Sequence, residues 1–427
     1  MKRNRIVLAA SLASITLVGT VTQSTAAGFK VGEQGAKPMA MANAFAAQAD
    51  DPSALAYNPA GIAFQKGTQF QLGTTTILVP QTEFEGTTRL SSTPVSERAN
   101  RDIFIAPTLY LTSSMDSLPL SFGLGVNSFN PLAKRWDAGS AFRDSIQEIA
   151  IKPINFQPTV AYRLDDLKLA VAAGFDVTYA QVSLQKMVYG PVPPPVNNPY
   201  GQYGTLGADA TAVGYGYNFG LKWNPLDNVS LGAAYRSKVR LDLEGDANFM
   251  PGTYGGSIGY QKTTASTDVT LPDSFTIGLA YKPTDKLTLE FDAEWTGWSS
   301  YDELVLKFGA PLAAFSNKPN PKNWKDVWAY RLGAQYAVSP MLDLRAGYAY
   351  DCSPTPDSTL SPELPDSDRH NVSIGTGLHN QFGSVDLAYM WVHWIDRSVN
   401  SSSNLNGISG TFKSDAHLLA ASVTLKF

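Results

Sequence analysis

The segment "SFTIGLAYKPTDKLTLEFDAEW", residues 274–295, gives the first indication of the fold. Its apolar side chains recur at every second position on both sides of a short turn. Phe275, Ile277 and Leu279 alternate with small or polar residues before the turn, and Leu289 and Phe291 alternate with charged ones after it. A period of two is typical of a β-strand with one apolar face. A water-soluble sandwich would give the same alternation, so this pattern alone predicts only strands.

The number of such segments and the lengths of their connections indicate a membrane barrel. We count about fourteen segments, an even number, as in single-chain outer-membrane barrels. Short connections near residues 165, 226, 284, 339 and 381 alternate with long ones at 81–100, 131–147, 189–208, 246–262, 309–323, 352–366 and 397–407. Short periplasmic turns and longer outer loops are typical of such barrels. The sequence therefore predicts an all-β, transmembrane antiparallel barrel over residues 67–427.

Aromatic residues support this interpretation. Trp295, Trp328 and Trp391 lie on the apolar faces of three segments, each near a long loop, as in an aromatic girdle. The chain ends with the alternating segment "HLLAASVTLKF" at Phe427, an end that we expect the barrel-assembly machinery to recognise. Core tryptophans of a soluble domain are the alternative.

The N-terminus and the composition indicate export. Residues 1–26 have a basic start, an apolar stretch and a small-residue site, which together predict a signal peptide. The single cysteine, Cys352, excludes an intrachain disulfide and a cysteine metal cluster. The net charge is −4 and becomes more negative once the basic start is removed, so nothing suggests a nucleic-acid partner.

Residues 27–66 precede the first strand and show little alternation. The part "DPSALAYNPAGIAF", residues 51–64, is apolar and rich in small residues, which suits short helices and turns. About fourteen strands enclose a lumen wider than their own side chains can fill. We therefore expect residues 27–66 to form a plug, or hatch, inside the barrel, with Asn58-Pro59 ending its last helical piece.

Four segments resemble one known family. They are "AGFKVGEQG" (27–35), "YNPAG" (57–61), "YRSKVRLDLEG" (235–245) and "YDCSPTPDSTLSPELPDSDR" (350–369). In this order they resemble the FadL-type outer-membrane transporters of long-chain fatty acids and other hydrophobic compounds, which include aromatic-hydrocarbon transporters. The resemblance implies a fourteen-stranded barrel that moves apolar ligands without its own energy source. It also implies that Asn58, Pro59 and Ala60 form the hatch motif.

The segment "LKLAVAAGFDVTYAQVSLQKM", residues 167–187, contains the candidate ligand site. Its outward face becomes polar after Tyr179, while the inward face continues with Val182, Leu184 and Lys186. An apolar lining with one cation suits an amphiphile that carries a carboxylate. The alternative is packing of a strand extension against loops, with Lys186 reaching towards water.

The resemblance adds detail to this site. It implies that Lys186 helps to bind the carboxylate of a fatty acid, and that a second lysine falls at Lys318 or Lys322. It also implies that apolar residues of the loops near 189–204 and 246–261 form a hydrophobic groove.

The segment "LSFGLGVNSFNPLAKRW", residues 120–136, contains the candidate exit. Pro131 lacks the N–H that a ladder bond needs, so it marks an interruption of the strand. Members of the resembled family have a kink here that opens a side window to the membrane. We expect the interruption within Asn127–Leu132, with Asn130 and Pro131 at the lateral opening. The alternative is that Pro131 only begins the following loop.

No catalytic constellation is evident. His370 and Ser373 fall on opposite faces of one segment, which disfavours a barrel lipase, and we expect no cofactor and no metal. The expected function is passive uptake of long-chain fatty acids through a plugged Gram-negative outer-membrane barrel, with lateral release into the outer-membrane lipids. Uptake of aromatic hydrocarbons is the close alternative, and a general porin is another. We expect a monomer.

Overall fold

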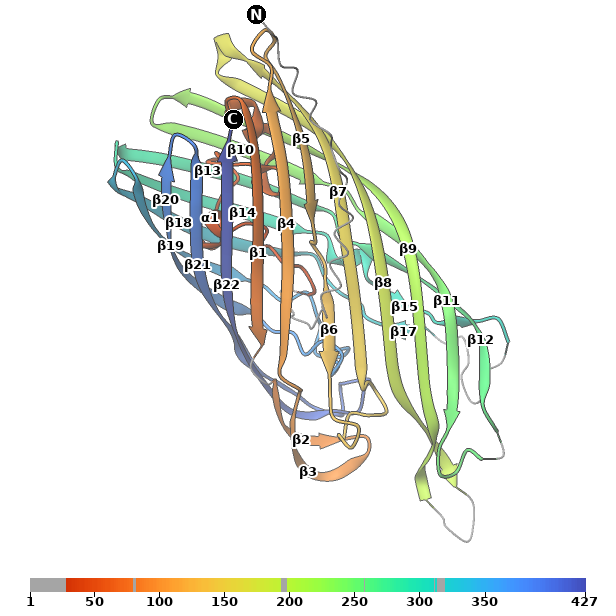
Figure 1. The fold of residues 1–427 in the computed structure, drawn as a ribbon. Helices are drawn as coiled ribbons and strands as arrows, with labels where there is room; N and C mark the ends of the chain where they lie inside the picture. The colour runs from red at the N-terminus through yellow and green to blue at the C-terminus, as the bar shows by residue number, and fades with distance from the viewer. Residues whose placement is uncertain (1–27, 80–81, 193–197, 257, 311, 313–318) are drawn as a thin grey trace, which may run out of the picture.

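The computed structural model describes residues 28–427, apart from residues 80–81, 193–197, 257, 311 and 313–318. The expected signal peptide lies outside the described residues and stays a prediction. The described chain forms a closed antiparallel barrel of 14 spans, in which β1 (Thr68–Val79) pairs with β22 (Ser409–Lys426) and so joins the first span to the last (Figure 1). The expected fold class is confirmed. Closure leaves the barrel without a free sheet edge along that seam.

Three of the spans are each built from two consecutive strands. These are β5 (Leu120–Asn127) with β6 (Leu132–Arg135), β10 (Val229–Arg236) with β11 (Val239–Pro251), and β12 (Gln261–Leu271) with β13 (Ser274–Thr284). The remaining spans are β4 (Asp102–Ser114), β7 (Glu148–Leu164), β8 (Leu169–Val192), β9 (Asn198–Leu226), β14 (Leu287–Thr296), β18 (Val327–Ser339), β19 (Leu342–Asp351), β20 (Arg369–Asn380) and β21 (Gly383–Val399).

The period-two pattern places its apolar face outward. Phe275, Ile277, Leu279 and Tyr281 on β13 are between 39% and 46% exposed, whereas the intervening Ala280 is buried in the lumen. Similar rows of exposed apolar side chains lie on the neighbouring strands. Exposing apolar surface to water costs about 25 cal/mol per Å². A bilayer removes this cost, so the outward apolar band indicates a membrane. No helix in the described part of the chain is long and apolar enough to cross a bilayer.

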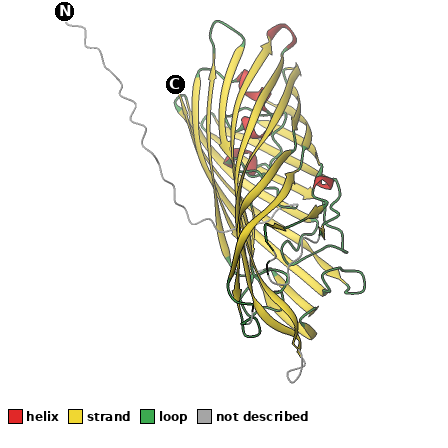
Figure 2. Ribbon diagram, turned by 90° about the vertical axis from the view of Figure 1, so that its right-hand side faces the viewer, coloured by secondary structure: helices red, strands yellow, loops and turns green. Residues whose placement is uncertain are grey.

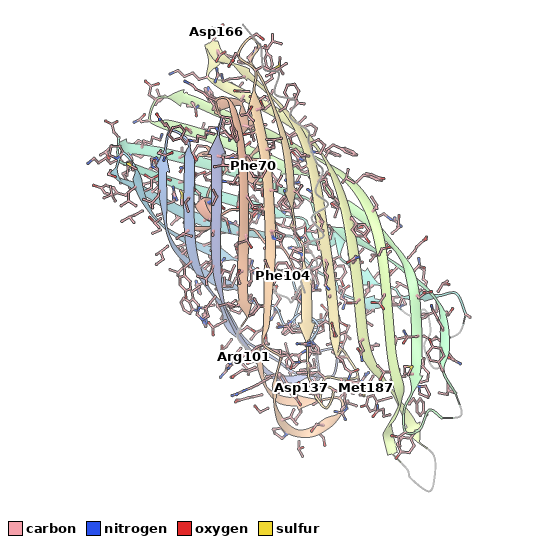
Figure 3. The ribbon with its side chains drawn as sticks, in the orientation of Figure 1. Phe70, Arg101, Phe104, Asp137, Asp166 and Met187 are labelled. Carbon is pink, nitrogen blue, oxygen red and sulfur yellow. The ribbon has the colours of Figure 1, made fainter. Side chains whose placement is uncertain are left out.

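The connections sort by length between the two ends of the barrel. Short turns, including η2 (Asp165–Leu167), lie at the end marked by Asp166 in Figure 3, and long connections lie at the end marked by Arg101 and Asp137. Small elements occupy the long connections: β2 (Glu83–Thr88), β3 (Ser91–Arg98), η3 (Trp298–Ser300), β15 (Glu303–Leu304), β16 (Lys307–Phe308) and β17 (Asn320–Pro321). The loop expected over residues 189–208 is wrong in extent, because β8 and β9 pair with each other far beyond the apolar band.

Residues 28–66 lie within the barrel, as the short helices between the strands in Figure 2 illustrate. They contain α1 (Ala36–Met39), α2 (Ala54–Tyr57) and η1 (Pro59–Phe64). The expectation that Asn58-Pro59 ends the last helical piece is wrong, because Asn58 both follows α2 and caps η1. A proline is well tolerated in the first turn of such a helix, where its missing N–H has no partner to lose.

Two wall carboxylates hold this segment by its backbone. Asp292 Oδ2 on β14 accepts the N–H groups of Phe45 and Ala46 at 2.8 and 2.9 Å. Glu290 Oε1, two residues earlier, accepts those of Ala47 and Gln48 at 2.6 and 3.2 Å. Period-two alternation aims both carboxyl groups into the lumen, so four consecutive buried N–H groups gain side-chain acceptors.

The third span is interrupted where the sequence placed the interruption. β5 pairs with both β4 and β7 and ends at Asn127, whereas β6 starts at Leu132 and pairs with β7. The β4–β5 register covers only Leu109 to Ser114, although β4 continues outward to Asp102. Towards the outer end, the N–H of Asn100 donates to the carbonyl of Arg135 at 2.9 Å. The wall between β4 and β6 therefore has a stretch without ladder pairing, bounded on both sides.

Candidate functional site

A pocket of about 540 Å³ opens among the outer loops and the end of β8, and we call it the outer pocket. Leu184 and Lys186 of β8 contribute to it from the wall. Its lining consists of Arg89, Asp144, Ser145, Leu184, Lys186, Leu304, Leu306, Phe308, Pro319, Asn320, Pro321, Glu363, Leu405 and Asn406. Apolar side chains thus share the pocket with about as many polar and charged ones.

The charges of the outer pocket are arranged in pairs. Arg89 Nε donates to Asp144 Oδ2 at 2.7 Å, and Lys322 Nζ donates to Glu363 Oε2 at 2.6 Å. Burial alone would raise the pKa of the Glu363 carboxyl, but the adjacent Lys322 ammonium holds it below its ordinary value. Both partners of this second pair are therefore charged at neutral pH.

Lys186 lies beyond the apolar band of β8, at the level where the outward face has become polar. Burial lowers the pKa of its ammonium group, and the carboxylates of Glu363 and Asp144 oppose that change. A bound carboxylate would add a further favourable charge beside this ammonium. The arrangement can thus hold an anionic head group with its alkyl chain against Leu184, Leu304 and Phe308.

The candidate ligand residues from the sequence fall at different places. Leu184 and Lys186 line the outer pocket, while Val182 packs against the apolar core of the lumen. Lys322 is buried next to the pocket and engaged by Glu363, and Lys318 lies outside the described residues. The roles of all of these residues stay predictions.

Three charged residues of the outer pocket were missed at the sequence level: Arg89, Asp144 and Glu363. They come from three loops far apart in the chain, and no spacing rule relates them. Only the Pro-rich segment 350–369, which contains Glu363, carried a signal, through its likeness to a late-loop pattern.

A second, smaller space of about 70 Å³ lies deeper, between the hatch, the interrupted third span and the opposite wall, and we call it the inner cavity. Its lining includes Tyr57 of the hatch, Phe129 and Asn130 of the third span, and Tyr235 and Arg236 of β10.

A chain of ion pairs borders the inner cavity. Lys30 of the hatch pairs with Glu294, Arg331 pairs with Glu294 at 2.9 Å, and Arg369 pairs with Asp351 at 2.8 Å. These charges have partners within the described structure, so they brace the lumen rather than offer a free catalytic group.

The motif Asn58–Pro59–Ala60 joins the hatch to the wall. Asn58 Nδ2 donates to the carbonyl of Ala46 at 2.7 Å and to that of Leu221 on β9 at 2.9 Å. Its Oδ1 accepts the N–H of Ala60 at 3.2 Å. One fully buried side chain therefore ties two parts of the hatch and a wall strand together.

The interrupted segment of the third span turns into the lumen. Asn130 and Pro131 are buried within it. The N–H of Val31 donates to the carbonyl of Phe129 at 2.7 Å, and Gln34 Nε2 donates to that of Ser128 at 2.7 Å. The hatch thus contacts the one segment of this span that lacks ladder pairing; its use as an exit stays a prediction.

Comparisons with known proteins agree with this architecture. A profile of the family described as "Outer membrane protein transport protein (OMPP1/FadL/TodX)" matches residues 17–427. An outer membrane protein of Neisseria meningitidis serogroup B is 27% identical, covering 97% of this chain and 98% of that protein. The long-chain fatty acid transport protein of Escherichia coli O6:H1 is 25% identical, covering 87% of this chain and 88% of that protein.

Two solved structures share the fold. A Pseudomonas aeruginosa FadL homologue superposes with a TM-score of 0.80 at 23% identity, covering 94% of this chain and 100% of the homologue. The Ralstonia pickettii toluene transporter TbuX superposes with a TM-score of 0.68 at 19% identity, covering 92% of this chain and 98% of the transporter.

Proposed function

The chain belongs to the outer membrane protein transport protein family (OMPP1/FadL/TodX), and on that premise we propose that it takes up long-chain fatty acids. Transport of hydrophobic compounds across the Gram-negative outer membrane is the activity of this family, which is a family of transporters rather than enzymes. Within the proposal, residues 1–26 are a signal peptide, residues 27–66 the hatch and residues 67–427 the barrel. The protein acts as a monomer, assembled through recognition of Phe427.

The outer pocket is the observation that carries the choice of substrate. Leu184, Leu304, Leu306 and Phe308 offer an apolar surface, and Lys186 stands beside them with a cationic head. A saturated chain with a terminal carboxylate can contact the apolar surface and also pair with the Lys186 ammonium, whereas a hydrocarbon can contact only the apolar surface. Aromatic hydrocarbons remain the second candidate, because the fold of a toluene transporter also fits the chain.

The proposed route runs from the outer pocket past the hatch to the interruption at Asn130-Pro131. An apolar chain gains no free energy by entering the aqueous periplasm, but it gains free energy by moving sideways into lipid. A general porin is disfavoured in this proposal, because the buried hatch residues occupy the lumen.

Reversal of the charge at Lys186 tests the substrate. Lys186→Glu places a like charge beside the ligand carboxylate and removes a charge-assisted hydrogen bond, which is worth roughly 1.5–3 kcal/mol. We expect fatty-acid binding to weaken about tenfold or more, since ~1.4 kcal/mol is a factor of ten. Binding of an uncharged hydrocarbon of equal length should change little.

The matched control is Lys262→Glu, which reverses an exposed lysine on β12 outside the pocket. It should leave both affinities unchanged. Equal losses for the fatty acid and the hydrocarbon would mean that Lys186→Glu damaged the fold. No loss for either would remove Lys186 from the site and leave aromatic hydrocarbons as the better candidate.

A further inference from the structure

The inward segment of the third span needs something to hold it in place. Between Asn127 and Leu132 it belongs to neither β5 nor β6, so the sheet does not fix its position. The hatch holds its backbone through the carbonyls of Ser128 and Phe129. The side chain of Phe129 is left to make its own contact with the interior.

That contact comes from the end of β10. The guanidinium carbon of Arg236, the last residue of β10, lies 4.0 Å from the centroid of the Phe129 ring. A guanidinium over an aromatic face is attractive, more so when both groups are shielded from water. Arg236 is only 17% exposed, so the contact is largely shielded.

Arg236 is itself fixed in place. Its Nη1 donates to Asp176 Oδ1 on β8 at 2.5 Å, and its Nη2 donates to Gln157 Oε1 on β7 at 3.3 Å. Asp176 is buried and also accepts from Asn155 and Asn218, both at 2.8 Å. These bonds from β10 to β8 and β7 fix the position of the guanidinium group, and the Phe129 ring packs against it.

The pair also stands on the route proposed above. Phe129 and Arg236 both line the inner cavity, and Phe129 belongs to the segment that interrupts the wall. A ligand that passes from the inner cavity to that interruption must move past the ring. The contact between the two side chains is therefore placed to control this passage.

We propose that Arg236 and Phe129 form a latch that keeps the interrupted segment inward and separates the inner cavity from the lateral opening. Arg236 is a positioning residue in this role: its planar guanidinium holds the ring, and an alkyl chain entering the cavity competes with that contact. The role of the latch in transport rests on the proposed function, whereas its role in holding the segment inward does not.

A thiol reporter at position 130 tests the latch without any ligand. Asn130 is buried and its Nδ2 has no hydrogen-bond partner, so Asn130→Cys sacrifices no bond that the structure records. The reporter is made in a Cys352→Ser background, and its rate of labelling by a maleimide is measured in lipid vesicles. Phe129→Leu keeps an apolar side chain but removes the ring, while Phe129→Tyr keeps the ring.

Breaking the latch should expose the reporter. We expect Phe129→Leu to speed labelling by about fivefold or more, as loss of a shielded cation–π contact allows, and Phe129→Tyr to leave the rate unchanged. Phe122→Leu on β5, whose ring faces lipid, is the matched control and should have no effect. Arg236→Lys keeps the charge but loses the planar group, so it should behave as Phe129→Leu does.

Equal labelling rates in Phe129→Leu, Arg236→Lys and the parent would overturn the latch. Transfer of a fluorescent long-chain fatty acid into the vesicle lipid is then measured on the same variants. A faster transfer in Phe129→Leu, with unchanged affinity of the outer pocket, is the result expected. Faster labelling with no fatty-acid transfer in any variant, the parent included, would keep the latch and refute the proposed substrate.

Discussion

Removing the Asp292 carboxylate should release the hatch. Asp292 Oδ2 accepts the buried N–H groups of Phe45 and Ala46 at 2.8 and 2.9 Å, and Asp292→Ala leaves both without an acceptor. Hydrogen bonds to charged groups are worth roughly 1.5–3 kcal/mol each, so the docked hatch should lose about 3 kcal/mol or more. That loss raises the population of an undocked hatch by about a hundredfold.

The assay is the ion conductance of the purified protein in planar bilayers, because an undocked hatch leaves an open aqueous lumen. We expect long, frequent openings in Asp292→Ala that are rare in the wild-type protein. Asp242→Ala removes an exposed carboxylate from the outward face of β11 and serves as the matched control. Wild-type conductance in Asp292→Ala, together with wild-type protection of residues 28–66 from protease, would refute the reasoning about hatch docking.

Three further outcomes concern the outer pocket and the contacts between the hatch and the wall. Because burial lowers the pKa of Lys186, its charge is lost at a lower pH than that of an ordinary lysine. Fatty-acid affinity, measured by titration, should therefore fall as pH rises towards 10, and Lys186→Arg should remove that fall. Asn58→Ala deletes bonds of 2.7 and 2.9 Å and a helix cap, so hydrogen exchange in the hatch should report a loss of roughly 2–4 kcal/mol, and full protection would contradict this. A Cβ at Gly232 would lie 2.0 Å from the Ala46 carbonyl, so Gly232→Ala should raise conductance, whereas Gly256→Ala, with open space around it, should not.

The strands could be predicted because their faces meet two different solvents. Phe275 and Ile277 must reach lipid while Gly278 and Ala280 pack inward, and a period of two satisfies both conditions along each span. The interruption of the third span was also predictable, since Pro131 cannot donate a ladder bond. These features depend on residues close together in the chain.

The outer pocket depends on residues far apart in the chain, and this is why it was only partly predicted. Lys186 and Leu184 follow from strand alternation, but Glu363 and Asp144 reach the same pocket through loop paths that the sequence does not specify. Lys322 was a candidate for binding the head group of the ligand, but in the structure its ammonium forms an ion pair with Glu363. The extension of β8 beyond the apolar band was expected as far as Met187, but its continuation to Val192 was missed because outside lipid the alternation of apolar residues fades while backbone pairing continues.

The central claim is that a fatty acid leaves the barrel sideways through the third span. The most direct measurement is the rate at which a fluorescent long-chain fatty acid enters the lipid of vesicles whose outer leaflet is lipopolysaccharide. Asn130→Thr with Pro131→Val supplies β-branched side chains and a backbone N–H, so that β5 and β6 can join into one strand. We predict several-fold slower entry for this variant with unchanged binding at the outer pocket; entry at the wild-type rate would contradict the lateral route.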